Sequence, residues 1–330
     1  MPLFRRESKP EPDLSLFFAT DLHGSDVCFR KFLNARAAYD VDLMILGGDM
    51  TGKLAIPIVE GAGGRCTVAA PGGPFEIEAS QLDDVREQLS RSGFYPFVTT
   101  PDEVEAYKAS PALVQQTLDR LMRERLEQWA AWADDKLAGT GVSIFVAPGN
   151  DDPFEIDDVL LGLPRFRLVE GQVIRPSPDH PFEMLSTGFT NRTPWDTPRE
   201  MEEESLAERF EKLVVDVEDP SRAIFNIHVP PYGSQLDNGP MLDWETMKLI
   251  GGIGQEVSVP VGSHACRAFL ERHQPMLALH GHIHESRAVT RIGRTIAINP
   301  GSDYGDGILR GVIVRLSDEG AVLSHQLTSG

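Results

Sequence analysis

The segment LSLFFATDLHG, residues 14 to 24, sets the pattern for the fold, because a short apolar run ends directly in Asp21 and His23. The pattern recurs in VDLMILGG (41–48) before Asp49, VSIFVAPG (142–149) before Asn150, AIFNI (223–227) before His228 and MLAL (276–279) before His280. Continuous apolar runs of this length predict strands that are buried on both faces of a sheet. Open α/β sheets place their sites just past the carboxyl ends of such strands, so we expect these polar side chains to gather at one edge.

Helical patterns lie between the predicted strands, which gives an α/β fold class. Residues 25–38 predict a helix with Ser25 as its N-cap, and residues 102–137 predict one long amphipathic helix. From Arg287 onward, four runs predict consecutive antiparallel strands that complete a second sheet: RAVTRIG, RTIAIN, ILRGVIVRL and AVLSHQL.

A single domain at residues 14–330 accommodates these elements, preceded by a loose tail at residues 1–13. Residues 53–95 break the rhythm with GAGG, APGGP and the hairpin pattern CTVAA-PGG-PFEIEA. We interpret this stretch as an insertion over the sheet edge that carries no recognisable chemistry. It could serve as a lid or as a dimer contact, so the sequence leaves a homo-oligomer open.

The excess of acidic over basic residues restricts the kinds of molecule that the protein can bind. The 330 residues include 31 basic and 50 acidic side chains, for a formal net charge of −19. Long nucleic acid is therefore a poor partner, since binding its backbone needs clustered Lys and Arg. A phosphate site in so acidic a protein needs another source of positive charge, and bound divalent cations would provide it.

The cysteines and the termini indicate a cytoplasmic protein. Cys28, Cys66 and Cys266 lie far apart, so neither a thiolate zinc site nor a disulfide framework is predicted. The N-terminal sequence has no apolar stretch long enough for a signal peptide, and no run approaches a membrane-spanning length. We therefore expect no membrane partner.

The polar residues at the strand ends have the chemistry of metal ligands. Each motif is weak alone, but their recurrence after five separate strands favours a joint site, made of Asp21, His23, Asp49, Asn150, His228, His280 and His282. Imidazole, carboxylate and amide oxygen suit Mn first, with Fe(II), Zn, Co or Ni as alternatives, and they match Ca poorly. A carboxylate shared by two cations holds them about 3.5–4 Å apart. Asp49 is the natural bridge between two such cations.

The motifs that contain these residues resemble the conserved blocks of the calcineurin-like metallophosphoesterase superfamily, which occur in the order DxH, GD, GN, H and GHxH. They appear here as Asp21-Leu22-His23, Gly48-Asp49, Gly149-Asn150, His228 and Gly281-His282, with His280 preceding Gly281. The resemblance implies a four-layer α/β/β/α sandwich with two mixed β-sheets and two divalent metal ions at the strand ends. One metal would take Asp21, His23, Asp49 and His282, and the other would take Asp49, Asn150, His228 and His280.

The expected reaction is the hydrolysis of a phosphate ester by a hydroxide that bridges the two metals, with Asp49 central to catalysis. The chain departs from the family at Gly149-Asn150-Asp151, where most relatives have His after Asn. A carboxyl group of raised pKa at Asp151 could donate a proton to the leaving group. The favoured alternative is that Asp151 is a turn residue or orients a metal ligand.

Asn150, Arg192 and Tyr232 are the candidate substrate contacts. Arg192 suits a phosphate oxygen, although an ordinary loop role is favoured for it, and Tyr232 follows His228 closely enough to line the pocket. We expect a metal-dependent phosphoric ester hydrolase, a phosphodiesterase or phosphatase, whose substrate is a small phosphodiester, nucleotide or phosphomonoester. The alternative is a metal-binding scaffold or regulatory protein of the same fold with weak or no hydrolase activity.

Overall fold

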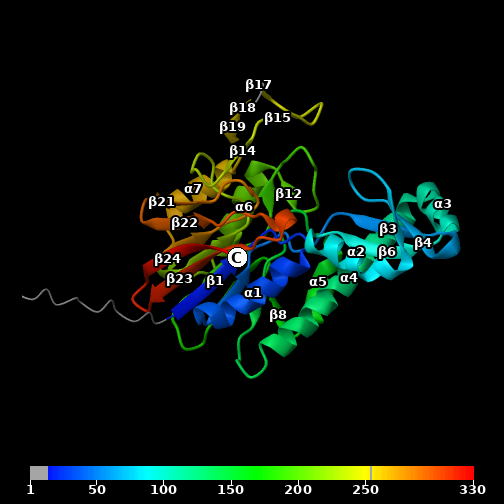
Figure 1. The fold of residues 1–330 in the computed structure, drawn as a ribbon. Helices are drawn as coiled ribbons and strands as arrows, with labels where there is room; N and C mark the ends of the chain where they lie inside the picture. The colour runs from blue at the N-terminus through cyan, green and yellow to red at the C-terminus, as the bar shows by residue number, and fades with distance from the viewer. Residues whose placement is uncertain (1–13, 253–254) are drawn as a thin grey trace, which may run out of the picture.

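Two six-stranded sheets pack face to face in the computed structural model, which describes residues 14–252 and 255–330 (Figure 1). The tail predicted at residues 1–13 lies outside the described residues. The first sheet has the order β24 (Ala321–Ser329), β23 (Arg310–Ser317), β1 (Leu14–Ala19), β2 (Leu43–Leu46), β7 (Ile144–Val146) and β8 (Phe166–Leu168). The second has the order β21 (Ala288–Ile292), β22 (Thr295–Asn299), β20 (Leu277–Leu279), β13 (Ile224–Ile227), β10 (Met184–Thr187) and β9 (Gln172–Ile174).

Side-chain alternation along β1 shows how the layers form. Leu16 and Phe18 pack in the core between the two sheets, whereas Phe17 and Ala19 pack in a second core under the helices of the first sheet. That outer layer includes α1 (Asp26–Tyr39), α4 (Pro111–Lys136) and α5 (Glu155–Leu161). The second sheet is covered by α6 (Glu203–Val214) and α7 (His264–His273) through a third core. The expected four-layer α/β/β/α sandwich with two mixed sheets is thereby confirmed.

Local sequence explains the first helix. The Ser25 hydroxyl accepts a hydrogen bond from the Cys28 N–H, as its predicted capping role requires. On the buried face of α1, Phe29 stacks on Trp129 of α4, with ring centroids 4.2 Å apart. The Trp129 indole N–H donates to Asp26 at 2.7 Å, so its polar edge is satisfied although the ring is buried.

The inserted stretch forms a small sheet of its own in the order β5-β4-β3-β6, drawn at the right of Figure 1. The predicted hairpin is confirmed as the antiparallel pair β4 (Arg65–Val68) and β5 (Phe75–Glu78). The sheet continues past the expected limit at residue 95, because β6 (Tyr95–Thr99) pairs in parallel with β3 (Ala55–Glu60). The helix α2 (Leu82–Arg91) packs its apolar side chains against this sheet.

The prediction of one helix at residues 102–137 is wrong. The chain forms α3 (Pro101–Ala109) and then α4, with Ser110 between them. The Ser110 hydroxyl accepts a hydrogen bond from the Leu113 N–H, and Pro111 occupies the first position of α4. Proline lacks an N–H and restricts the residue before it, which explains why the first helix ends here.

The predicted placement of the last two strands is also wrong. β21 and β22 form the expected antiparallel pair in the second sheet. β23 returns instead to the first sheet, where it pairs antiparallel with β1, and β24 pairs with β23. Val312, Val314 and Leu316 of β23 are buried in the core between the sheets, so this crossing completes the sandwich.

Among the described residues, four two-stranded sheets lie outside the two large sheets. β11 (Thr190–Asn191) pairs with β12 (Glu200–Met201). A projecting segment at the top of Figure 1 is built from β14 (Asn238–Pro240) with β19 (Ser258–Pro260) and from β15 (Leu242–Asp243) with β16 (Lys248–Leu249). A further strand pair, β17 (Gly251–Gly252) with β18 (Gln255–Glu256), lies at its end.

In the part of the chain that the structure describes, no helix is long and apolar enough to cross a bilayer.

Candidate metal centre

The carboxyl ends of β1, β2, β13 and β20 meet at one edge of the sandwich, and sharp turns there expose side chains to one another. Four non-glycine residues in these turns have positive φ: Asp21 (55°), His23 (42°), Asp49 (48°) and His282 (69°). Each such conformation costs about 1–3 kcal/mol and is typically retained at functional sites. All four are predicted ligands, so the backbone strain lies where the sequence indicated the site.

Asp21, His23 and His284 form the first group, whose ligand atoms lie within 4.8 Å of one another. The His284 Nε2 atom lies 3.3 Å from the Asp21 carboxylate and 3.1 Å from the His23 Nε2 atom. Asp21 and His23 were predicted from the sequence, whereas His284 was not. The group offers one carboxylate and two imidazoles to a cation.

Asp49, His228 and His282 form the second group. The His228 Nε2 atom lies 3.4 Å from Asp49 Oδ2 and has no hydrogen-bond partner, while its Nδ1 atom contacts the Gly47 carbonyl at 2.9 Å. A carbonyl only accepts, so Nδ1 carries a proton, and Nε2 is the ring nitrogen left to bind either a second proton or a metal. The predicted ligand Asn150 joins this group, since its Oδ1 atom lies 2.8 Å from His282 Nδ1.

Asp49 lies between the two groups. Its Oδ2 atom is 3.4 Å from the Nε2 atom of His228 and 3.7 Å from the Nε2 atom of His23. Its Oδ1 atom accepts a hydrogen bond from the Asp151 N–H at 3.0 Å, which fixes the carboxylate plane. The arrangement fits the predicted bridging carboxylate, because one side chain reaches the imidazoles of both groups.

His280 does not join either group. Its Nδ1 atom contacts the backbone carbonyls of Ile227 and Val229, at 2.8 and 3.0 Å. Its Nε2 atom is buried without a hydrogen-bond partner, and the ring is absent from each cluster of possible ligands found among residues 14–252 and 255–330. The structure therefore brings together His282 and His284 rather than the predicted His280 and His282. The block GHxH, taken as Gly281 to His284, already contained this signal.

The electrostatics of the site fit a metal centre. Burial opposes ionisation of Asp21, but the neighbouring His228 and His284 outweigh it and lower the pKa of Asp21 to about 2. The pKa of Asp49 lies well below its usual value, because His228 and His23 outweigh the effect of burial. Burial lowers the pKa of His23 to about 3 and that of His282 to about 4. Ionised carboxylates and neutral imidazoles are the forms that bind metals.

His228 shows where positive charge is needed. Burial lowers the pKa of His228, but the carboxylates of Asp49 and Asp21 outweigh burial and raise it to about 9. Without a metal, the two buried carboxylates thus hold a proton on this ring. A divalent cation would replace that proton on the Nε2 atom, so the donor set fits the group that the family resemblance implies.

Asp152, which the sequence analysis did not assign to the site, ties two of the site loops together. The side chain is fully buried and accepts from the Met50 N–H at 3.0 Å, the Gly149 N–H at 2.9 Å, and both the N–H and the hydroxyl of Thr51 at 2.9 and 2.7 Å. Met50 and Thr51 belong to the loop that carries Asp49, and Gly149 belongs to the loop that carries Asn150. Burial and repulsion from Asp49 raise the pKa of Asp152, and the hydrogen bonds oppose this rise. The carboxylate therefore positions ligands rather than binding substrate.

Asp151 faces the site beside a cation. Its carboxylate forms an ion pair with the Lys53 ammonium and lies 4.0 Å from His23 Nδ1. Burial and repulsion from Asp49 raise the pKa of Asp151 to about 7, although Lys53 lowers it. Both predicted alternatives for Asp151, proton donor and orienting residue, fit this position.

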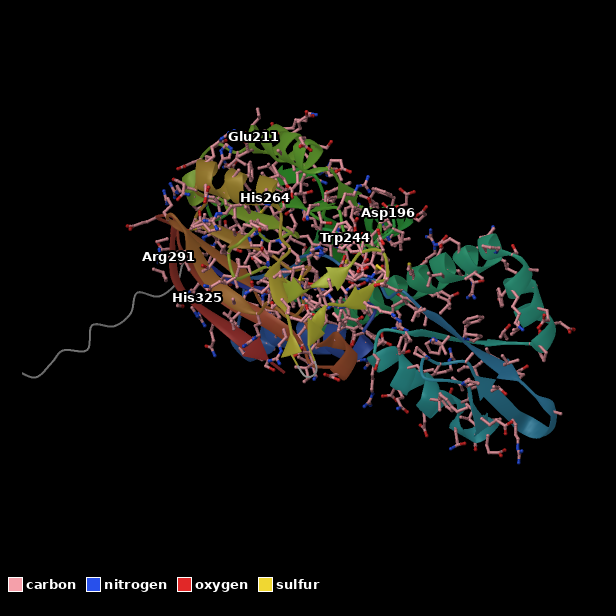
Figure 2. The ribbon with its side chains drawn as sticks, turned by 90° about the horizontal axis from the view of Figure 1, so that it is seen from above. Asp196, Glu211, Trp244, His264, Arg291 and His325 are labelled. Atoms are coloured by element: carbon pink, nitrogen blue, oxygen red, sulfur yellow. The ribbon has the colours of Figure 1, made fainter. Side chains whose placement is uncertain are left out.

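A cavity of about 760 Å³ opens over the site, and Asp49, Asn150, Asp151, His282 and His284 are among the residues that line it. Both remaining substrate candidates also line it. Arg192 forms ion pairs with Asp196 at 2.9 Å and Glu202 at 3.1 Å. Tyr232 stacks on His264, with ring centroids 3.9 Å apart. His264, at the start of α7, and Asp196 are labelled in Figure 2.

One of the comparisons with known proteins bears on the fold. No family model matches the chain. An uncharacterised protein of Methanocaldococcus jannaschii is 28% identical over 161 residues, which span 48% of this chain and 64% of that relative. One crystal structure superposes with a TM-score of 0.52 at 13% identity, covering 96% of this chain and 98% of the other. This likeness supports the sandwich fold that the resemblance implied.

Two further solved structures align over 96% of this chain. A protein of Thermus thermophilus has a TM-score of 0.48, 14% identity and 98% of its own chain covered. An archaeal phosphodiesterase has a TM-score of 0.37, 9% identity and 100% of its own chain covered.

Proposed function

We propose that this chain is a calcineurin-like phosphoesterase that hydrolyses a small phosphate ester with two divalent metal ions. The observation that carries the proposal is the position of Asp49, whose Oδ2 atom lies within 3.7 Å of imidazole nitrogens from both ligand groups. One ion would be held by Asp21, His23, His284 and Asp49. The other would be held by Asp49, Asn150, His228 and His282.

Bound at these groups, two divalent ions would acidify a water molecule and neutralise charge on phosphoryl oxygens. The protein supplies the arrangement. Asp49 reaches both groups, and Asp152 fixes the loop that carries Asp49 to the loop that carries Asn150. Lys53 adds a positive charge at the mouth of the site, where its ammonium faces Asp151.

Asp151 replaces the histidine that most members of the superfamily have after Asn150. We propose that Lys53 and Asp151 take over contact with the leaving-group oxygen, with the protonated form of Asp151, which its pKa of about 7 keeps populated at neutral pH, as the proton donor. Its carboxylate lies at the wall of the cavity beside Asp49, where an ester oxygen can reach it. Asp151→Asn tests this assignment: we expect a larger loss of rate on esters with poor leaving groups than on p-nitrophenyl esters. Equal losses on both would contradict it.

The experiment that tests the overall function is an assay of the purified protein with Mn²⁺ on bis(p-nitrophenyl) phosphate and p-nitrophenyl phosphate. Asp49→Ala should lose both the metal and the activity. His325→Ala serves as the matched control, because this exposed side chain on β24 takes no part in the site. Release of p-nitrophenol from neither ester, with metal bound, would contradict the hydrolase.

The alternative function is a metal-binding scaffold or regulatory protein. The departure at Asp151 is the observation that favours it, because an anionic side chain beside a phosphate ester opposes binding unless it is protonated or paired. Full metal occupancy without hydrolysis of either ester would support this alternative.

A further inference from the structure

The walls of the site cavity are unusual for an acidic protein that handles phosphate. Five of the large hydrophobic side chains that remain exposed line this one cavity: Tyr232 (37% exposed), Trp195 (59%), Met241 (38%), Trp244 (63%) and Leu249 (56%). Apolar side chains exposed singly are ordinary, whereas a group that lines one cavity marks a binding surface. The cavity therefore combines the polar ligand groups with a large exposed apolar surface.

Four of these five side chains come from two segments, and Tyr232 comes from the loop between β13 and β14. Trp195 lies in the loop between β11 and β12. The other wall is the arm, which we define as residues 238–250 and 257–260. Trp244 lies in the turn between β15 and β16, where Asp243 accepts hydrogen bonds from the N–H groups of Glu245 and Thr246 at 3.1 and 2.8 Å. These hydrogen bonds order the backbone of the turn that presents the exposed Trp244. Figure 2 labels it.

The charged groups of the lining argue against a substrate with several phosphates. Arg192 is already paired with two carboxylates, and Lys53 is paired with Asp151. Glu203 and Glu285 also line the cavity and add negative charge. Among the described lining residues, then, no unpaired Lys or Arg is left for a second phosphate. The remaining surface suits an uncharged, apolar group.

We propose that the substrate is a phosphate ester in which one alcohol carries a bulky apolar group, alkyl or aryl, that packs between Trp195 and the arm. The proposal rests on the proposed function, since the phosphate is placed at the ligand groups. A cavity of about 760 Å³ falls within the range of pockets that enclose a ligand of drug size. A small phosphate such as a methyl ester would leave most of it to water.

The test compares p-nitrophenyl phosphodiesters whose second alcohol is methyl, butyl, octyl or 2-naphthyl. The quantity is the ratio of kcat/KM for each ester to kcat/KM for the methyl ester, which a general loss of activity does not change. We expect the octyl or naphthyl ratio to exceed about tenfold, since each buried methylene contributes several-fold. Preference for octyl over naphthyl indicates a lipid-like substrate, and the reverse preference indicates an aryl one.

Trp244→Ala and Trp195→Ala should each lower this ratio by about threefold or more. Phe75→Ala is the matched control, because Phe75 is an exposed aromatic residue of β5 outside the cavity, and the ratio should not change. A binding readout is independent of turnover: octylphosphonate should bind the wild-type protein more tightly than methylphosphonate in calorimetry, and Trp244→Ala should reduce the difference.

The outcomes separate the two proposals. Hydrolysis of every ester at one rate, with equal binding of both phosphonates, would overturn the apolar specificity and leave the hydrolase intact. Absence of hydrolysis with preferential binding of octylphosphonate would overturn the hydrolase and support the apolar site. An unchanged ratio in both tryptophan variants would refute the assigned walls.

Discussion

Replacing Asp152 by Asn should destabilise the protein and the site together. The carboxylate accepts four hydrogen bonds, from Met50, Gly149 and Thr51, in a fully buried position. An amide of the same shape keeps only one acceptor oxygen, and its NH₂ group is best placed toward Thr51, whose hydroxyl can accept from it. The buried Thr51 N–H then lacks an acceptor, at about 1–3 kcal/mol. Relief of the repulsion between Asp152 and Asp49 offsets part of this cost.

The assay is urea unfolding followed by tryptophan fluorescence, with metal binding measured on the same samples. Asp158→Asn is the control, because Asp158 is exposed on α5 and the change is chemically the same. We expect a fall in the free energy of unfolding of about 1–3 kcal/mol for Asp152→Asn, and weaker Mn²⁺ binding. A fall below about 1 kcal/mol with unchanged metal affinity would refute the positioning role.

Three further predictions concern the ligands and their support. His284→Ala should lower the number of Mn²⁺ ions bound per chain from two to one, whereas His280→Ala should leave two. Metal analysis after gel filtration measures both, and the opposite result would restore His280 as the ligand predicted from the sequence. Gly149→Ala should abolish metal binding, because its Cβ would lie 2.2 Å from Asp49 Oδ1, and normal metal content would refute this packing. Arg199→Lys should destabilise the fold by about 2–4 kcal/mol in urea unfolding, because its buried guanidinium donates to two backbone carbonyls and to a carboxylate; a stability equal to wild type would contradict that role.

The strand-end residues could be predicted because the rule behind them is geometric. Parallel strands buried on both faces have continuous apolar sequences, and their carboxyl ends share one edge. Asp21, Asp49 and His228 follow such strands directly, and the structure brings them together. The fold class followed from the same runs.

The strand pattern does not decide between His280 and His284, although the GHxH block aligned on Gly281 to His284 does. Both imidazoles belong to HGHIH, and the direction of each depends on the turn at His282, where φ is 69°. That turn sends His284 toward Asp21, while His280 remains hydrogen-bonded to the backbone beside β13. Alternation along a strand says nothing about residues beyond such a turn.

Other differences reflect long-range packing. The pairing of β23 with β1 joins segments almost 300 residues apart, roughly the length of the chain, and local propensity does not specify such a partner. The helix break at Ser110-Pro111, by contrast, had a local signal, since proline after a capping residue begins a new helix. The role of Asp152 depends on four donor groups of three residues in two loops, and no sequence pattern predicts it.

The most direct test of the account is anomalous diffraction from crystals of the protein soaked in Mn²⁺. We predict two peaks about 3.5–4 Å apart, one beside Asp21, His23 and His284 and one beside His228 and His282, with Asp49 contacting both. A single peak, or two peaks of which only one contacts Asp49, would contradict the shared carboxylate.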